Sequence, residues 1–199
     1  MGSGAGLYKA ADLLFRLKRI PAARGLLVKL AEFMPQYPGV HRALAKMAQV
    51  EHDKAGALAE MKQEIANHPE DPKFKIDLGE LLMSYEDFQA ARLPLSEVAN
   101  LPPAARAPEY IYDKIRAYLL LARCFRAQNH LESAEGAITL ARELDPNDPE
   151  LIKEYGYIEA GLFHAKEAAS AFESYLQRVP AAADAPQIQK WIESLQIAN

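Results

Sequence analysis

Small and bulky apolar residues return along this chain at fixed distances from a series of prolines. The prolines are Pro35, Pro69, Pro103, Pro146 and Pro180. An alanine stands twelve positions before each proline: Ala23, Ala57, Ala91, Ala134 and Ala168. Alanine or glycine stands 24 positions before it: Ala11, Ala45, Gly79, Ala122 and Gly156. A bulky apolar residue stands eight positions before it: Leu27, Met61, Leu95, Ile138 and Phe172. Because close packing sets small residues against large ones, the pattern predicts pairs of helices that cross at the small positions.

The spacing of the prolines gives the length of the repeated unit. They are 34 residues apart, except for one step of 43 residues between Pro103 and Pro146. We therefore place five units at 4–37, 38–71, 72–105, 115–148 and 149–182, with an irregular insert at 106–114. Repeats of this length are helical units that bury their apolar faces against one another.

Residues 183–199 are predicted to form a capping helix after the last unit. Asp184 and Gln187 have the spacing of a capping box, and Pro186 falls in the first turn, where its missing N–H costs little. The apolar residues that follow share one face of a helix: Ile188, Trp191, Ile192 and Leu195. We expect this face, with the only tryptophan, to pack on the fifth unit.

These residues resemble the tetratricopeptide repeat family, whose 34-residue unit is a helix, a turn and a second helix. The unit 115–148 matches the family pattern best, through Tyr118, Leu121, Ala122, Phe125, Ala134, Ile138, Ala141 and Pro146. Departures also occur, since Glu64 and Glu159 occupy places that are usually apolar. The resemblance implies an all-α, right-handed solenoid of five helix-turn-helix repeats with a C-terminal capping helix.

The joint between the third and fourth units is irregular. Pro94 falls inside an expected helix, which should therefore kink or end early, and a new helix is predicted from Glu109 to about Gln128. Its first turns carry Tyr110 and Tyr112. Two interpretations stay open: these tyrosines pack on the preceding helix, or they form a second interface with a partner or another copy.

Composition is that of a folded, soluble protein, with half of the residues apolar and a net charge of −4. No apolar run is long enough for a membrane span, and no signal segment begins the chain. Residues 1–6 resemble a cloning scar, so a signal or an upstream domain could have been removed. We favour the cytoplasm, with the periplasm as the alternative if a signal was removed. Cys124, the only cysteine, is expected to be a packed thiol, with a reactive role as the alternative.

No motif for catalysis, a cofactor or a metal stands out. The five histidines lack the spacing of a zinc site, and the alternating glycines near the start follow no strand that a phosphate loop would need. The sequence also lacks a nucleophile elbow. We therefore expect a chain that is not an enzyme and takes no cofactor.

The resemblance implies that the first helix of each unit lines a groove. Helical spacing on those helices gives eight basic residues against three acidic ones, or nine against five if the face is drawn wider. The predicted partner-binding groove comprises Arg16, Arg42, Lys46, Lys73, Arg116, Arg123, Arg126, Lys153 and Tyr157. Because arginines hold carboxylates bidentately, we expect an acidic or carboxylate-ended protein segment in it, the alternative being a solvated charged face. Reversing Arg123 and Arg126 to Glu is expected to abolish binding and leave the fold intact.

Taken together, the sequence predicts a non-enzymatic scaffold or adaptor that binds a partner segment in its groove. Nucleic acid is disfavoured as the partner, because the chain is acidic overall and no series of stacking aromatics accompanies the arginines. The alternative function is a regulatory or substrate-recruiting segment of a larger enzyme or of a secretion or assembly machine.

Overall fold

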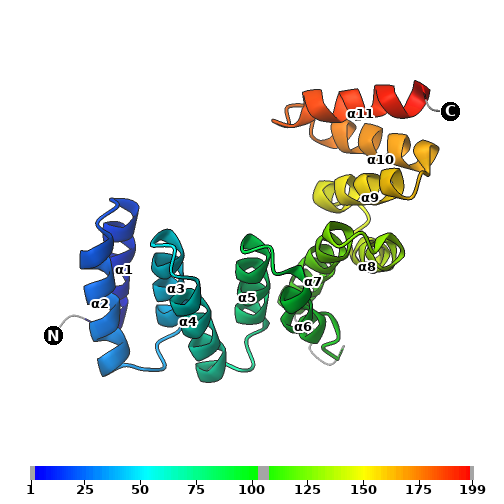
Figure 1. The fold of residues 1–199 in the computed structure, drawn as a ribbon. Helices are drawn as coiled ribbons and strands as arrows, with labels where there is room; N and C mark the ends of the chain where they lie inside the picture. The colour runs from blue at the N-terminus through cyan, green and yellow to red at the C-terminus, as the bar shows by residue number, and fades with distance from the viewer. Residues whose placement is uncertain (1–2, 103–107, 198–199) are drawn as a thin grey trace. The chain divides into compact units, whose positions relative to one another are not determined.

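The computed structural model describes residues 3–102 and 108–197, and this part of the chain contains eleven α-helices and no strand (Figure 1). It divides into two compact units between Leu81 and Leu82. The helices are α1 Gly4–Arg16, α2 Ile20–Phe33, α3 Val40–Val50, α4 Lys54–Asn67, α5 Pro72–Ser84, α6 Phe88–Ala99, α7 Pro108–Ala127, α8 Leu131–Leu144, α9 Pro149–Gly161, α10 Ala165–Arg178 and α11 Ala185–Ile197.

Neighbouring helices pack as antiparallel pairs within each unit. In the first unit α1 packs on α2 and α3 packs on α4; in the second α7 packs on α8, α9 on α10, and α11 on α10 (Figure 1). The second helix of each pair begins at Ile20, Lys54, Phe88, Leu131 and Ala165, at steps of 34, 34, 43 and 34 residues. The predicted all-α solenoid of helix pairs is confirmed.

The residues that carry the repeat pattern are buried. The five alanines 12 positions before the prolines have no exposed surface, and Leu95, Ile138 and Phe172 are equally inaccessible. Gly156 shows why its position stays small, since a Cβ added there would lie 2.6 Å from Cε1 of Phe172. Packing between the two helices of a pair therefore dictates these residue types.

The turn inside each helix pair contains one residue in the left-handed conformation. These residues are Lys18, His52, Glu86, Asn129 and Phe163, with φ between 57° and 64°. Each lies two positions before the second helix of its pair, so this turn repeats in step with the helices. None of these residues is glycine, which adopts this conformation without steric cost, and only Asn129 is of a type enriched in it.

Replacing Phe163 with glycine is expected to raise the free energy of unfolding by about 1 kcal/mol. A left-handed residue with a Cβ costs about 1–2 kcal/mol, which outweighs the greater entropy of glycine in the unfolded chain. Little packing is lost, because Phe163 is 92% exposed. Urea denaturation measures the effect, and Asn129→Gly is the matched control with a smaller gain, since asparagine tolerates this conformation. A less stable Phe163→Gly protein would contradict the prediction.

The irregular joint differs in part from the prediction. The helix with Pro94 does not end at the proline: α6 continues to Ala99 and has 12 residues, where the other second helices have 14. The long helix is confirmed as α7, which begins at Pro108 and takes up the last residues of the predicted insert 106–114. Residues 103–107, which include Pro103, lie outside the described residues, as do Met1 and Gly2 of the predicted scar.

The last helix covers the fifth pair as predicted. Ile188 and Ile192 of α11 are buried against α10, in a cluster with Phe172. Trp191 contacts the rings of Tyr157 and Phe172, with centroid distances of 6.3 Å and 6.5 Å. The expectation that the only tryptophan packs on the fifth unit is confirmed.

Cys124 of α7 is buried, as expected for a packed thiol. Burial raises the pKa of this thiol to about 11, so it is protonated at neutral pH.

Candidate functional site

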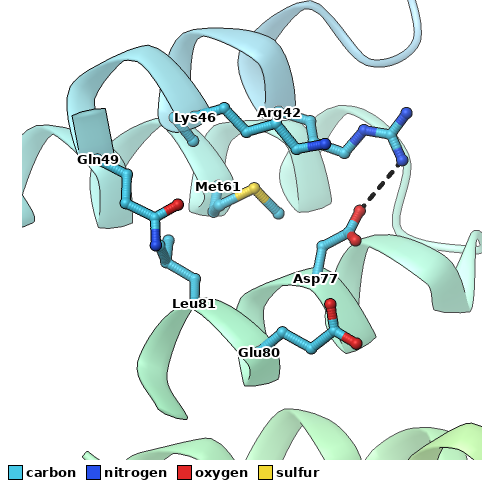
Figure 2. Close-up of a pocket in the computed structure, with 8 residues that line it drawn as sticks. Arg42, Lys46, Gln49, Met61, Asp77, Glu80 and Leu81 are labelled. Carbon is cyan, nitrogen blue, oxygen red and sulfur yellow. Dashed lines mark hydrogen bonds and ion pairs between the residues drawn. The ribbon is translucent and has the colours of Figure 1, made fainter. Parts of the chain in front are cut away.

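Two neighbouring pockets open on the first-helix face of the unit that ends at Leu81. The α3–α5 pocket, of about 210 Å³, is shown in Figure 2. It is lined by Arg42, Ala45, Lys46, Gln49, Met61, Asp77, Glu80 and Leu81. The α1–α3 pocket, of about 120 Å³, is lined by Tyr8, Asp12, Phe15, Leu27, Arg42, Ala43, Lys46 and Met47. Arg42 and Lys46 line both pockets, so α3 separates them.

The start of α3 is held in place from two sides. Glu64 of α4 is completely buried and accepts hydrogen bonds from the backbone N–H groups of Gly39 (2.7 Å) and Arg42 (3.0 Å). Tyr8 of α1 donates its hydroxyl proton to the carbonyl of Gly39 at 3.4 Å. Gly39 itself has φ 86°, a conformation that disfavours residues with a Cβ. These contacts fix the backbone from which Arg42 and Lys46 project.

The two cations that line both pockets, Arg42 and Lys46, differ in their ion pairing. Arg42 pairs with Asp77 at 3.3 Å and lies over the ring of Phe74, 5.7 Å from its centroid. Burial raises the pKa of Asp77, and the charge of Arg42 opposes that rise. Lys46 is exposed and makes no ion pair within the described part of the chain, but its charge also opposes the rise in the pKa of Asp77 (Figure 2). Lys46 and Lys73 are the two predicted groove cations that no ion pair holds among the described residues.

The other two predicted residues of this unit lie at its edges. Arg16 is exposed and pairs with Asp12 one turn earlier on α1, at 2.9 Å. Lys73 lies in the first turn of α5, is exposed, and forms no side-chain ion pair among the described residues. Neither residue lines the two pockets.

The first-helix face of the second unit carries a chain of ion pairs between α7 and α9. Arg116 pairs with Glu150 at 3.3 Å, whereas Arg123 contacts both Glu150 (3.8 Å) and Glu154 (3.3 Å). Arg126 completes the series with a 2.6 Å contact to Glu154. The Glu154 side chain is only 4% exposed, so these arginines neutralise a buried carboxylate. The structure therefore gives no support to the expectation that reversing Arg123 and Arg126 leaves the fold intact.

The remaining predicted residues of this face contact the capping helix. Lys153 of α9 pairs with Asp184 at 2.8 Å, and the hydroxyl of Tyr175 donates to the same carboxylate at 2.7 Å. The hydrogen bonds from these two groups lower the pKa of Asp184. Tyr157 packs against Phe172 and Trp191, and the guanidinium of Arg126 lies 5.3 Å from its ring centroid.

Six of the eight predicted basic groove residues are thus already paired with acidic side chains. The sequence count treated each side chain as independent, so it did not include these internal ion pairs. Glu64 and Asp184 were not recognised as parts of this surface. Glu64 could have been noticed, since a carboxylate at a usually apolar position needs a partner when it is buried.

The residues at the predicted second interface, at the start of α7, differ in their exposure. Tyr112 is 70% exposed and Ile111 is 46% exposed, whereas Tyr110 is half-buried and Ile115 is buried. The structure therefore leaves both interpretations open for the start of α7: packing on the preceding helix, and contact with a partner or another copy.

Residues 3–102 and 108–197 contain no group of three or more His, Cys, Asp or Glu side chains placed to hold a metal ion. Within the same residues, no helix is long and apolar enough to cross a membrane.

Comparison with known proteins gives likeness in structure only. Neither a model of a protein family nor a curated protein matches the sequence. Among solved structures, PilW, a type IV pilus biogenesis factor, is 15% identical with a TM-score of 0.72, over 98% of this chain and 91% of PilW. A fragment of MamA from Desulfovibrio magneticus RS-1, from position 41 to its end, is 21% identical with a TM-score of 0.70, over 92% of this chain and 99% of the fragment.

A third likeness is to YrrB, described as a TPR protein with an unusual peptide-binding site. It is 15% identical with a TM-score of 0.66, and the match covers 94% of this chain and 92% of YrrB. At identities this low, the TM-scores show a shared fold and no more. The chain therefore has the fold of a tetratricopeptide-repeat solenoid, as its sequence predicted.

Proposed function

We propose that this chain is a non-enzymatic interaction scaffold, and that it binds a peptide segment of a partner protein across the two pockets of α3. The observation that carries the proposal is the position of Lys46, an exposed cation without an ion pair, between two pockets with apolar floors. Met61 and Leu27 in those floors are almost fully buried. Side chains of an extended peptide would fill the pockets on either side of the lysine.

The peptide is expected to carry a carboxylate where it meets Lys46. A carboxylate there gains a charge-assisted hydrogen bond and breaks no existing ion pair, although the charge of Lys46 also acts on Asp77. At Arg42 it would compete with Asp77, and at Arg123 or Arg126 it would compete with the buried Glu154. Asp77 and Glu80 also line the α3–α5 pocket, so we expect one well-placed carboxylate in the ligand rather than a run of acidic residues.

Selection of a displayed peptide library on the chain tests the proposal. We expect the retained peptides to share an acidic residue or a terminal carboxylate flanked by apolar residues. Lys46→Glu should weaken their binding at least about tenfold, equivalent to about 1.4 kcal/mol. Fluorescence anisotropy with the retained peptides gives the dissociation constants.

Lys62→Glu is the matched control, because it makes the same charge change on α4 outside both pockets. It should leave the affinity nearly unchanged. A library that yields no binder, or binders that the Lys46→Glu chain retains equally well, would refute binding at α3.

Two further hypotheses from the sequence remain predictions. One is the second interface at Tyr110 and Tyr112 on α7, of which Tyr112 is exposed and Tyr110 is half-buried. The same scaffold would also serve as a recruiting segment of a larger enzyme or assembly machine.

A further inference from the structure

A polar pocket of about 390 Å³ lies between α8 and α10, on the second-helix side of the second unit. None of the predicted groove residues lines it. Its lining consists of Arg142, Pro146, Ile152, Tyr155, Glu167, Ser170, Ala171, Ser174 and Arg178. Two guanidinium groups and two serine hydroxyls thus share one cavity with a single carboxylate.

Arg178 is exposed, yet its guanidinium is oriented by neighbours. One terminal nitrogen donates to Oγ of Ser174 at 2.7 Å, and the other donates to Oδ1 of Asn147 at 3.1 Å. A guanidinium has five N–H groups, so donors remain after these bonds are made. The group is held in place before any ligand arrives.

Arg142 is fixed in a different way. Its guanidinium lies over the ring of Tyr155, 4.0 Å from the centroid. Its Nε is buried and has no hydrogen-bond partner among the described residues. A buried donor of this kind is unfavourable unless an acceptor reaches it.

The repeat does not require these polar residues. One repeat earlier, 34 positions before Ser174 and Arg178, α8 carries Leu140 and Leu144. Both leucines are more than 40% exposed. Helix pairing therefore tolerates apolar side chains at these positions, and the serine and arginine on α10 are specific to the last pair.

We propose that the α8–α10 pocket binds an oxyanion, a carboxylate or a phosphate group, between Arg142 and Arg178. Among the lining residues the two guanidiniums exceed the charge of Glu167 by one unit, and the nearby Glu159 is paired with His164 at 2.8 Å. The fork of an arginine matches the oxygens of either anion. Ser170 supplies a further hydroxyl donor at the wall. This site is independent of the peptide surface at α3.

Two probes test whether the pocket binds a phosphate or a carboxylate. They are inorganic phosphate and acetyl-aspartate amide, which carries a carboxylate. Each is titrated into the full chain at constant ionic strength, and the arginine Nε–H signals are followed by NMR. We expect saturable shifts of the Arg142 and Arg178 signals with at least one probe. Arg178→Gln should weaken that binding at least about tenfold, because it removes one charged donor group.

Arg92→Gln is the control for a general charge effect. Arg92 lies over the ring of Phe125 at 4.4 Å, outside the pocket, so its loss should not change the affinity. Arg142→Lys keeps the charge and removes the fork, and it should also weaken binding while thermal unfolding stays cooperative. Absence of shifts, shifts that never saturate, or equal binding by the Arg178→Gln chain would overturn the proposal.

Discussion

Replacing Arg123 and Arg126 with glutamine is expected to lower the free energy of unfolding by about 3–5 kcal/mol. Both arginines contact Glu154, whose side chain is 4% exposed, so the variant would leave a buried carboxylate without a cation. Breaking a buried ion pair by removing one partner has a cost of this size. Urea denaturation followed by circular dichroism measures the loss.

A third substitution separates the buried charge from other effects. Adding Glu154→Gln to the double variant removes the unpaired charge, and most of the lost stability should return. If the triple variant is no more stable than the double one, the loss comes from packing of the arginine stems, and the buried carboxylate is not its cause.

Glu64→Leu is the second substitution with a large expected effect, about 3 kcal/mol of destabilisation. Leucine matches the apolar preference of this position in the repeat, but it would leave the N–H groups of Gly39 and Arg42 without their acceptor at the start of α3. Hydrogen bonds to a charged group contribute about 1.5–3 kcal/mol each. Urea denaturation of the whole chain reports the change.

Glu64→Gln is the matched control. Its amide oxygen can still accept from one of the two backbone groups, so the loss should be smaller. A Glu64→Leu chain as stable as the original would mean that the cost of burying the carboxylate equals the gain from its hydrogen bonds.

The fold could be predicted from the sequence because its signals are local and repeated. The small residue at the helix crossing and the bulky residue opposite it, such as Gly156 and Phe172, recur at one period. The left-handed turn residues could not be predicted, since Lys18 and Phe163 have no intrinsic preference for that conformation. Their backbone is dictated by the packing of the helices on either side.

The candidate site was predicted less completely. The position of Arg42 and Lys46 on the first-helix face follows from helical spacing, and both line the pockets there. Which cations remain available follows from spacing only for Arg16, which pairs with Asp12 on the same helix; the other partners lie about 30 or more positions away in the sequence. Arg126 meets Glu154 across 28 positions, and Lys153 meets Asp184 across 31.

The contacts of Trp191 make the chain carry its own spectroscopic reporter. Trp191 is the only tryptophan, and its ring contacts those of Tyr157 and Phe172. Its fluorescence emission therefore reports whether α11 stays attached to the last helix pair. Circular dichroism follows all helices at once. If the two signals change at different urea concentrations, the last helix detaches before the repeats unfold, and two-state treatment of the stability data no longer applies.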